Sequence, residues 1–464
     1  LNYELIISAK ILFEVKNGTG GGSIGISNLG YSKVTAGSIR VYNMTSRGIN
    51  NRGPLTVSGN VEIDTVANFG INFDGAVNMH TVIGGDLIIK NTGGHAISAA
   101  VNGVNLWVKG NAFIDNVTGA VSGNCNGVRI NSGANNVVIK IDGMLEIKNI
   151  ATTIAAGHGI YIANATGTLD AGVIVIRPAD GGQKSVGGSG IYNNVGTINA
   201  GSISIEKTSA VAITNNSGGV IEVAARPTVT GADGKISVNN VVSGHGIVNN
   251  PTTAKGGKIK ADAISVNGFT GNGIVNNMGT TALPSIIEVT GLFEVKNGTG
   301  SGSIGISNLG YSKITAGSIN ISNTGNHAIN NRGPLAVSGD VTIDTTRGTA
   351  NGINNDNAVG SVNIAGVLRL NNIAGSYGIN LVANGNLTLG TLIETNKPLN
   401  ILGNFLSSTA SSVELIWLPS NGTTIGVVRG TASNISKLNS VLYIQDTAWK
   451  LQQNGNSLDL VSAS

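Results

Sequence analysis

Apolar and polar residues alternate over short runs along most of the chain, and a glycine stands in the middle of each run. The pattern is aliphatic, any, aliphatic, any, glycine, any, aliphatic, any, aliphatic, as in residues 55–63 and 335–343. Strict alternation over a few residues is typical of a half-buried strand. A glycine inside such a run marks a bend or a close approach of another backbone. We therefore expect two short strands that flank a glycine corner in every repeat.

A second motif, glycine or alanine followed by isoleucine or valine, recurs between these runs at spacings of 22 to 34 residues. We call its aliphatic members the anchor residues. They are Ile26, Ile49, Ile71, Ile97, Val128, Ile160, Ile191, Ile213, Ile247, Ile274, Ile306, Ile329, Ile353 and Ile379. The residue before the anchor is glycine in eleven cases and alanine in three. This size limit predicts a third strand per repeat with a closely approached backbone.

Asparagine stands two positions after nine of the fourteen anchors. These residues are Asn28, Asn51, Asn193, Asn215, Asn249, Asn276, Asn308, Asn331 and Asn355. The other five positions hold Phe73, Ala99, Ile130, Ile162 and Leu381. An offset of two places the position on the same strand face as the anchor. Because asparagine alternates with apolar residues there, we predict inward asparagines whose amides hydrogen-bond from coil to coil as a ladder.

A long internal duplication sets the architecture. Residues 12–65 recur as residues 292–345, with 41 of 54 positions identical. Self-similarity of this kind is the signature of a solenoid, and no segment keeps the period of a helix. We predict an all-β fold, a single-stranded parallel β-helix of about 14–16 coils with three short strands per coil over residues 1–400. The pattern fades afterwards, and we expect a C-terminal β cap or closing module over residues 401–464.

Composition removes several functional classes. Charged residues make up 11% of the 464 residues, the net charge is only +4, and no basic patch is interleaved with aromatic residues, so we expect no nucleic-acid partner. No apolar run reaches the roughly 18 residues of a membrane helix, so we expect no membrane span. A single cysteine, Cys125, excludes an intramolecular disulfide, and we expect a loop or core thiol. Residues 12–17 recur in mid-chain, so the apolar start is not read as a signal peptide.

The coil length, the glycine and asparagine usage and the long duplication resemble those of bacterial right-handed β-helix surface proteins. These include autotransporter passengers, filamentous-haemagglutinin-like adhesins and extracellular filament proteins. The resemblance covers residues 1 to about 400 and rests on pattern, without a diagnostic motif. It implies an extracellular or cell-surface location and a scaffold, adhesive or filament role.

Many β-helices cleave polysaccharides, and two Gly-His-Gly triplets, at 157–159 and 244–246, are compatible with such an enzyme. Glycoside hydrolysis needs two carboxylates at most ~9.5 Å apart, and the chain has no Asp-Asp pair. The histidines also share one repeat position, two residues before an anchor, where other repeats carry Arg, Phe, Asn, Ser or Tyr. They are His95, His158, His245 and His327. We therefore expect surface side chains, and predict no enzyme, no catalytic, cofactor-binding or metal site, and no cofactor.

Other motifs have simpler interpretations. Four aspartates precede a glycine, at Asp74, Asp142, Asp180 and Asp233, and an isolated Asp-Gly is first a turn signal. A tandem calcium-binding nonapeptide array is absent. Glycosylation triplets occur at several asparagines, including Asn17, Asn116, Asn164 and Asn421. A chain this rich in Asn, Ser and Thr produces most of them by chance.

The sequence leaves two main functional hypotheses. The first is an extracellular structural protein, a self-associating subunit of a surface filament, sheath or surface layer. The alternative is an adhesin or autotransporter passenger segment that binds cell-surface glycans or a host surface; a polysaccharide-degrading enzyme comes third. Exposed strand edges pair with other chains, and residues 5–17 match an interior segment, 285–297. We therefore expect a head-to-tail homopolymer joined through residues 3–15.

Overall fold

The computed structural model shows a nearly all-β chain that forms a parallel β-solenoid of about 15 turns. The described residues contain one short helix. The described residues are 6–30, 32–75, 79–119, 125–151, 153, 157–250, 255–277, 283–382, 384–408, 410–417 and 426–463. The predicted fold class is confirmed. The chain divides into a first unit, residues 1–243 with 259–261, and a second unit, residues 244–258 with 262–464.

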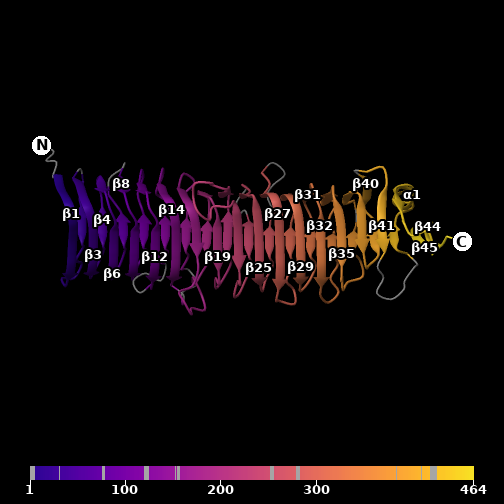
Figure 1. The fold of residues 1–464 in the computed structure, drawn as a ribbon, viewed down its shortest axis with the longest axis horizontal. Helices are drawn as coiled ribbons and strands as arrows, with labels where there is room; N and C mark the ends of the chain where they lie inside the picture. Colours follow the sequence, from indigo (N-terminus) through magenta and orange to yellow (C-terminus); the bar gives the residue numbers. More distant parts are fainter. Residues whose placement is uncertain are drawn as a thin grey trace. The chain divides into compact units, whose positions relative to one another are not determined.

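In the first unit, the strands that carry the anchors form one parallel sheet, which we call the anchor sheet. They are β2 (Ile26–Asn28), β4 (Ile49–Asn51), β7 (Ile71–Phe73), β10 (Ile97–Ala99), β13 (Val128–Ile130), β15 (Ile160–Ile162), β17 (Ile191–Asn193) and β20 (Ile213–Asn216). The register pairs each anchor with the anchor of the next coil, beginning with Ile26 and Ile49. The anchors therefore form one continuous column in this unit, along the stacked strands of the ribbon in Figure 1.

The runs around the glycine corner form a second parallel sheet of the first unit, the corner sheet. Its strands are β1 (Ile6–Gly18), β3 (Lys33–Met44), β5 (Leu55–Val57), β6 (Val61–Val66), β8 (His80–Ile83), β9 (Leu87–Thr92), β11 (Asn105–Val108), β12 (Ala112–Val117), β14 (Val138–Ile150), β16 (Thr168–Ile176), β18 (Thr197–Ala200), β19 (Ile203–Glu206), β21 (Val220–Val223), β22 (Lys235–Asn239) and β24 (Lys258–Ala261). Some coils carry one long strand through the corner, and the register of β1 on β3 then shifts between Ala9 and Leu12.

The second unit repeats both sheets. Its anchor strands are β23 (Ile247–Asn250), β26 (Ile274–Asn276), β28 (Ile306–Asn308), β30 (Ile329–Asn331), β33 (Ile353–Asn355), β36 (Ile379–Leu381), β39 (Leu399–Ile401) and β42 (Val428–Gly430). Its corner strands are β25 (Ala263–Phe269), β27 (Ile286–Gly298), β29 (Lys313–Thr324), β31 (Pro334–Val337), β32 (Val341–Thr346), β34 (Ser361–Ile364), β35 (Val367–Asn371), β37 (Asn386–Leu389), β38 (Leu392–Thr395), β40 (Asn404–Ser408) and β41 (Val413–Trp417).

Parallel pairing in the second unit continues past residue 400. β40 and β41 pair with β37 and β38, and β42 pairs with β39. The chain then forms α1 (Ala432–Val441), β43 (Leu442–Tyr443), β44 (Trp449–Asn454) and β45 (Ser457–Ser462). β45 pairs antiparallel with both β42 and β44, so an antiparallel hairpin follows the last coil. No helix in the described part of the chain is long and apolar enough to cross a membrane.

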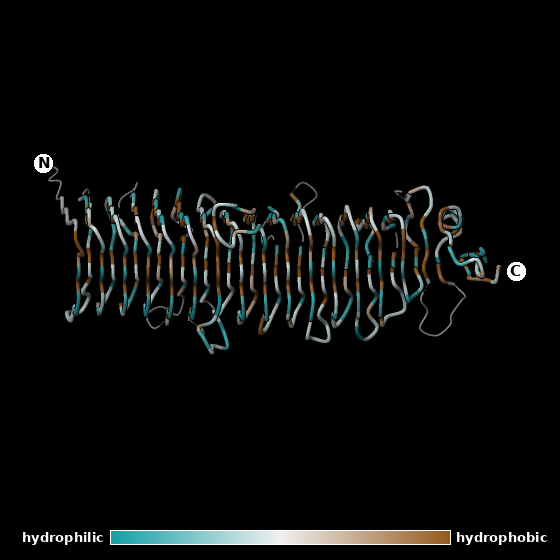
Figure 2. Tube along the Cα trace, in the orientation of Figure 1, coloured by the Kyte–Doolittle hydropathy of each residue, from teal (hydrophilic) through white to brown (hydrophobic). Residues whose placement is uncertain are grey.

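The core is aliphatic, as the low aromatic content predicts. All fourteen anchors are at most 7% exposed, so their predicted inward column is confirmed in each unit. Brown apolar and pale or teal polar positions alternate along the strands in Figure 2. Val57 and Ile63, on the two sides of one glycine corner, are both buried. The alternating runs therefore place one face inside and one face outside, as expected for half-buried strands.

The small residue before each anchor has a direct steric cause. A β-carbon on Gly48 would lie 2.7 Å from the carbonyl oxygen of Gly70 in the next coil. The same oxygen accepts the hydrogen bond from the backbone N–H of Ile49 at 2.9 Å. The coil-to-coil hydrogen bond of the anchor therefore brings a carbonyl into the space of a side chain at the preceding position.

Candidate functional site

The predicted asparagine ladder lies inside the solenoid. In the second unit, Asn249, Asn276, Asn308 and Asn331 are all fully buried. Each donates its side-chain Nδ2 to the Oδ1 of the next, at 2.9, 3.0 and 2.9 Å along the row. Because a buried amide without partners costs free energy, the ladder fixes the coil register. This prediction is confirmed.

The four repeat-related histidines do not lie freely on the surface, and the expectation of surface side chains is wrong. His95 is only 2% exposed, and the other three are half-buried. In each case the ring Nδ1 accepts the backbone N–H of the residue at the same position in the next coil. The donors are Asn126 to His95 at 3.0 Å, Ser189 to His158 at 3.0 Å, Asn272 to His245 at 2.8 Å and Asn351 to His327 at 2.9 Å.

Asparagine makes the same hydrogen bond at this position. The Oδ1 atoms of Asn126, Asn272 and Asn351 accept the backbone N–H of the next coil at 3.0, 3.1 and 3.2 Å. In both residue types the accepting atom is bonded to Cγ, so it extends equally far from the backbone. We call this row the cap column. The mixture of residue types at this position led the sequence analysis to predict a surface position. Histidine and asparagine share a hydrogen-bond acceptor bonded to Cγ, and this was the signal that the sequence analysis missed.

Burial keeps these histidines neutral. It lowers the pKa of His158 to about 4. It lowers the pKa of His95 to about 3, with a further contribution from the Arg129 guanidinium. The pKa values of His245 and His327 are also lowered by burial. An unprotonated Nδ1 is required to accept a hydrogen bond, so the low pKa preserves the cap at neutral pH.

Aromatic rings also stack between coils. The ring of Tyr161 lies 5.5 Å from that of Tyr192, and His158 lies 5.7 and 5.0 Å from these two rings. A sugar ring binds an aromatic side chain over its open face. Here neighbouring side chains face one another's rings, so this cluster contributes to the contact between coils.

The Asp-Gly carboxylates that the structure describes bind side-chain or backbone groups of the protein. Asp74 accepts from Arg47 Nη1 and from Arg52 Nε, both at 2.9 Å. Burial alone would raise the pKa of Asp74, but the two guanidinium groups outweigh it and the pKa lies below its ordinary value. Asp142 accepts from the Trp107 indole at 2.8 Å. Within the described ranges, no group of three or more His, Cys, Asp or Glu could hold a metal ion.

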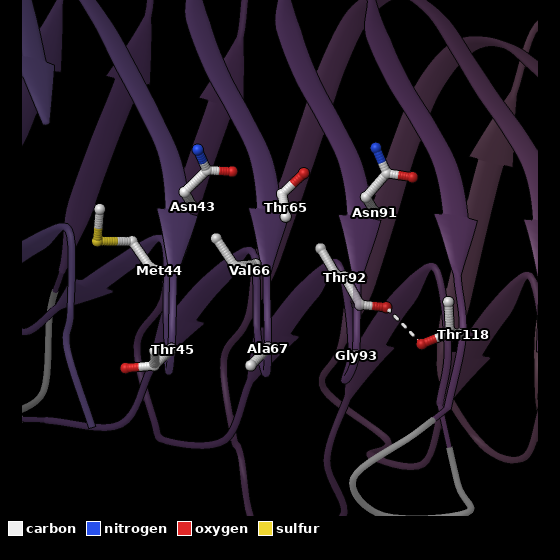
Figure 3. Close-up of a pocket in the computed structure, with 10 residues that line it drawn as sticks. All are labelled: Asn43, Met44, Thr45, Thr65, Val66, Ala67, Asn91, Thr92, Gly93 and Thr118. Carbon is white, nitrogen blue, oxygen red and sulfur yellow. Dashed lines mark hydrogen bonds between the residues drawn. The ribbon is translucent and has the colours of Figure 1, made fainter. Parts of the chain in front are cut away.

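A shallow groove of about 550 Å³ runs along the outer surface of the first unit (Figure 3). One side is formed by Asn43, Thr65 and Asn91, whose φ angles are positive (52° to 57°). Met44 and Val66 supply an apolar floor. Neighbouring amides are hydrogen-bonded along the coils, since the Nδ2 of Asn43 donates to Asn17 Oδ1 at 2.9 Å and that of Asn116 to Asn91 Oδ1 at 2.6 Å. This second asparagine ladder was not predicted.

The remaining singled-out residues lie as follows. Cys125 is fully buried. Asn164 is 6% exposed and its Nδ2 donates to the Ser132 carbonyl at 2.7 Å, so the folded chain has no room for a glycan there. Asn421 lies outside the described residues. No protein-family model, curated protein or solved structure matches the chain.

Proposed function

We propose that this protein is an extracellular structural protein, a self-associating subunit of a surface filament, sheath or surface layer. The observation that carries the proposal is the continuous coil-to-coil pairing within each unit, as of β2 with β4 and of β28 with β30. Strand edges at the ends of such stacks pair with other chains unless they are blocked.

The internal duplication strengthens the argument. The second copy of the block, in β27 and β28, is covered on the corresponding side by β25 and β26. From Leu12 onward, nearly the same sequence is therefore compatible with strands on both sides. The predicted connector, residues 3–15, is described from Ile6 onward. A head-to-tail contact between copies does not close on itself, and so it builds an open polymer.

The use of side chains supports a structural role as well. Buried asparagines, half-buried histidines and stacked rings all connect one coil to the next. The low charge and the resemblance to surface β-helix proteins favour an extracellular location over a cytosolic one. In this proposal the protein functions through its folded solenoid and the contacts between copies, without a catalytic site.

Sedimentation velocity of the full chain over a range of concentrations, with electron microscopy of the same samples, tests the proposal. We expect concentration-dependent polymers. A variant that lacks residues 1–11 should stay folded, by circular dichroism, and sediment as a monomer. Filaments of normal length from this variant would show that the N-terminal strand is not the connector.

The groove of Figure 3 favours the alternative, an adhesin or passenger segment that binds glycans. Its polar rim over an apolar floor, Met44 and Val66, is the composition of many ligand sites. Isothermal titration with a panel of surface polysaccharides tests it. Binding that is lost in Thr65→Trp, which fills the groove, would support the adhesin, and unchanged binding in that variant would exclude this groove as the site.

A further inference from the structure

A positively charged side chain on the outer face of the anchor sheet of the first unit has no opposite charge beside it. Arg129 is the middle residue of β13, and its side chain points outward between the buried Val128 and Ile130. It is half-buried. Within hydrogen-bond distance of its guanidinium, the described residues offer His95 Nε2, 2.6 Å from Nη1, and Asn131 Oδ1, 3.5 Å from Nη2. Neither neighbour carries a negative charge.

The contact between Arg129 and His95 brings two donors together. Burial keeps the His95 ring neutral, with its pKa lowered to about 3. Its Nδ1 accepts the backbone N–H of Asn126 at 3.0 Å, so the single proton of the neutral ring lies on Nε2. The nitrogens of a guanidinium donate and do not accept. The Nε2–H of His95 and the Nη1–H of Arg129 therefore cannot hydrogen-bond to each other.

This contact is particular to His95 among the four histidines of the cap column. The other three make the same hydrogen bond through Nδ1, but no arginine or lysine of the described chain lies within hydrogen-bond distance of their Nε2 atoms. They are His158, His245 and His327. The opposed donors are therefore a local feature of β10 and β13, and the cap column as a whole does not require them.

Other guanidinium groups beside the anchor sheets have a carboxylate partner from the chain itself. Arg47 and Arg52 both donate to Asp74 at 2.9 Å. In the second unit, Arg332 donates two hydrogen bonds to Asp356, at 2.7 and 2.8 Å. Each of these aspartates stands three positions after an anchor. The solenoid thus has a regular place for the carboxylate that neutralises such an arginine.

This place holds no acidic residue around Arg129. It is Ala100 in the preceding coil, Asn131 in the same coil and Ala163 in the next. No Asp or Glu in the described ranges forms an ion pair with Arg129. The undescribed segments between residues 6 and 463 contain no Asp or Glu either. Because a half-buried charge loses hydration, this position favours an anion from outside the chain.

We propose that His95 and Arg129 together bind an oxyanion, with the Nε2–H of His95 and the Nη1–H of Arg129 both donating to it. The ligand is a sulfate, phosphate or carboxylate group, either a free ion or a group on an acidic polysaccharide. An oxygen that accepts from both groups replaces the opposed donors by two hydrogen bonds to a charged acceptor. The proposal does not depend on self-association.

The two side chains suit this role in different ways. The His95 ring is held by its cap hydrogen bond and by the Phe69 ring, which stacks parallel to it at a centroid distance of 5.3 Å. Its Nε2–H is therefore a donor of fixed position. Arg129 has a long, flexible arm, so its guanidinium can move outward to admit an oxygen atom and still donate to it.

Equilibrium dialysis of the full chain against labelled sulfate, at constant ionic strength, tests the site whether or not copies associate. We expect saturable binding of one sulfate per chain, and Arg129→Gln should weaken it at least tenfold. Arg347 is the matched control, since its exposed guanidinium contacts only the amide oxygen of Asn323 among the described residues. Arg347→Gln should change sulfate affinity by less than twofold. Equal sulfate binding by Arg129→Gln and the unaltered protein would overturn the proposal.

Two further variants separate the site from the fold. His95→Asn keeps the cap acceptor, because Asn126 makes the same hydrogen bond one coil later, but removes the Nε2 donor. Asn131→Asp places a carboxylate where an amide oxygen already lies 3.5 Å from Arg129 Nη2, and this carboxylate should compete with sulfate. Each variant should weaken sulfate binding at least fivefold with an unchanged circular dichroism spectrum. Unchanged affinity in either variant would contradict the proposed geometry.

NMR of the chain with ¹⁵N-labelled histidine observes the donor directly. His95 should carry its proton on Nε2, and this resonance should shift as sulfate saturates the site. His158 makes the same cap hydrogen bond and has no arginine beside it, so its resonance should stay in place. A proton on Nδ1 of His95, or equal shifts of both histidines, would overturn the proposal.

Competition for labelled sulfate distinguishes the source of the anion. If dextran sulfate displaces it at a lower concentration of sulfate groups than free sulfate does, the site binds the acidic group of a polysaccharide. Displacement at equal concentrations of sulfate groups assigns the site to a free ion. Neutral dextran should displace none, and displacement by neutral dextran would show that the ligand is not an oxyanion.

Discussion

Histidine and asparagine are interchangeable in the cap column because each offers one acceptor at the same distance from the backbone. Ser189 N–H donates to His158, and the N–H of His158 itself donates to Asn126. A polar side chain beside a coil thus replaces a missing backbone acceptor. The contribution of the residue to the fold comes from its acceptor atom, and its ability to titrate is a secondary property.

A histidine in the cap column predicts that the free energy of unfolding depends on pH. The folded pKa of His158 is about 4 and its ordinary value is 6.5, so the unfolded chain binds more protons between these values. The stabilisation is complete above about pH 6.5 and is lost as the pH falls towards 4. At pH 5 we expect a loss of roughly 2 kcal/mol from this residue.

Urea denaturation at pH 7.5 and pH 5 of the unaltered protein and of His158→Asn measures the effect. Asparagine retains the acceptor and does not titrate, so the variant should show a smaller loss between the two pH values. Equal losses in both proteins would mean that His158 does not contribute through its protonation.

The buried asparagine ladder predicts that replacing asparagine by aspartate lowers stability more inside the solenoid than on its outer face. Asn308→Asp replaces a donor by a carboxylate in a fully buried position, and we expect a destabilisation of roughly 2–4 kcal/mol. Asn330 is half-buried on the outer face, and its Oδ1 accepts from Asn354 Nδ2 at 3.1 Å. Asn330→Asp can still accept that bond and should cost less than about 1 kcal/mol. Thermal unfolding of both variants is the measurement, and an unchanged midpoint for Asn308→Asp would contradict the ladder.

At the scale of the strand, side-chain hydrogen bonds before and after the anchor help to fix the register between neighbouring coils. Anchor strands of only three residues pair anchor on anchor, as in β28 with β30, and short strands alone specify register weakly. Where they occur, the inner amides and the cap column add side-chain hydrogen bonds after and before the anchor. A one-residue slip would expose every anchor and break both rows together.

The close backbone contact beside the anchor predicts that the residue before the anchor cannot carry a large side chain without a loss of stability. A β-carbon on Gly305 would lie 2.6 Å from the Ala328 carbonyl oxygen, whereas one on Gly302 would meet no atom within 4 Å. We expect Gly305→Val to destabilise the protein by about 1–3 kcal/mol, and Gly302→Val to change stability by less than about 0.5 kcal/mol. Chemical denaturation of the two variants compares them directly. Equal stabilities would show that the coil backbone shifts to accept the side chain.

At the scale of the whole molecule, the two units contain different kinds of strand pairing. The first described coil of the first unit consists of the parallel strands β1 and β2, which pair with β3 and β4. The second unit ends with α1 and an antiparallel hairpin. Natural solenoids cover their ends with atypical repeats.

The structural role also predicts the absence of polysaccharide cleavage. His158 and His245 hold backbone N–H groups of the next coil, so they are not free to transfer protons to a substrate. Incubation with a panel of acidic polysaccharides should release no reducing or unsaturated sugars. Release that disappears in His158→Ala would contradict this prediction and would establish an enzyme.

The sequence by itself determined the solenoid, the three strands per coil and the inward rows of anchors and asparagines. It could do so because these features depend on a local rule, alternation on a strand, that every repeat restates. The cap column and the outer asparagine ladder came only from the tertiary structure. Each of them depends on which atom of one coil meets which atom of the next. Positions some 22 to 34 residues apart in sequence are brought together by the stacking, and composition at one position does not reveal the partner.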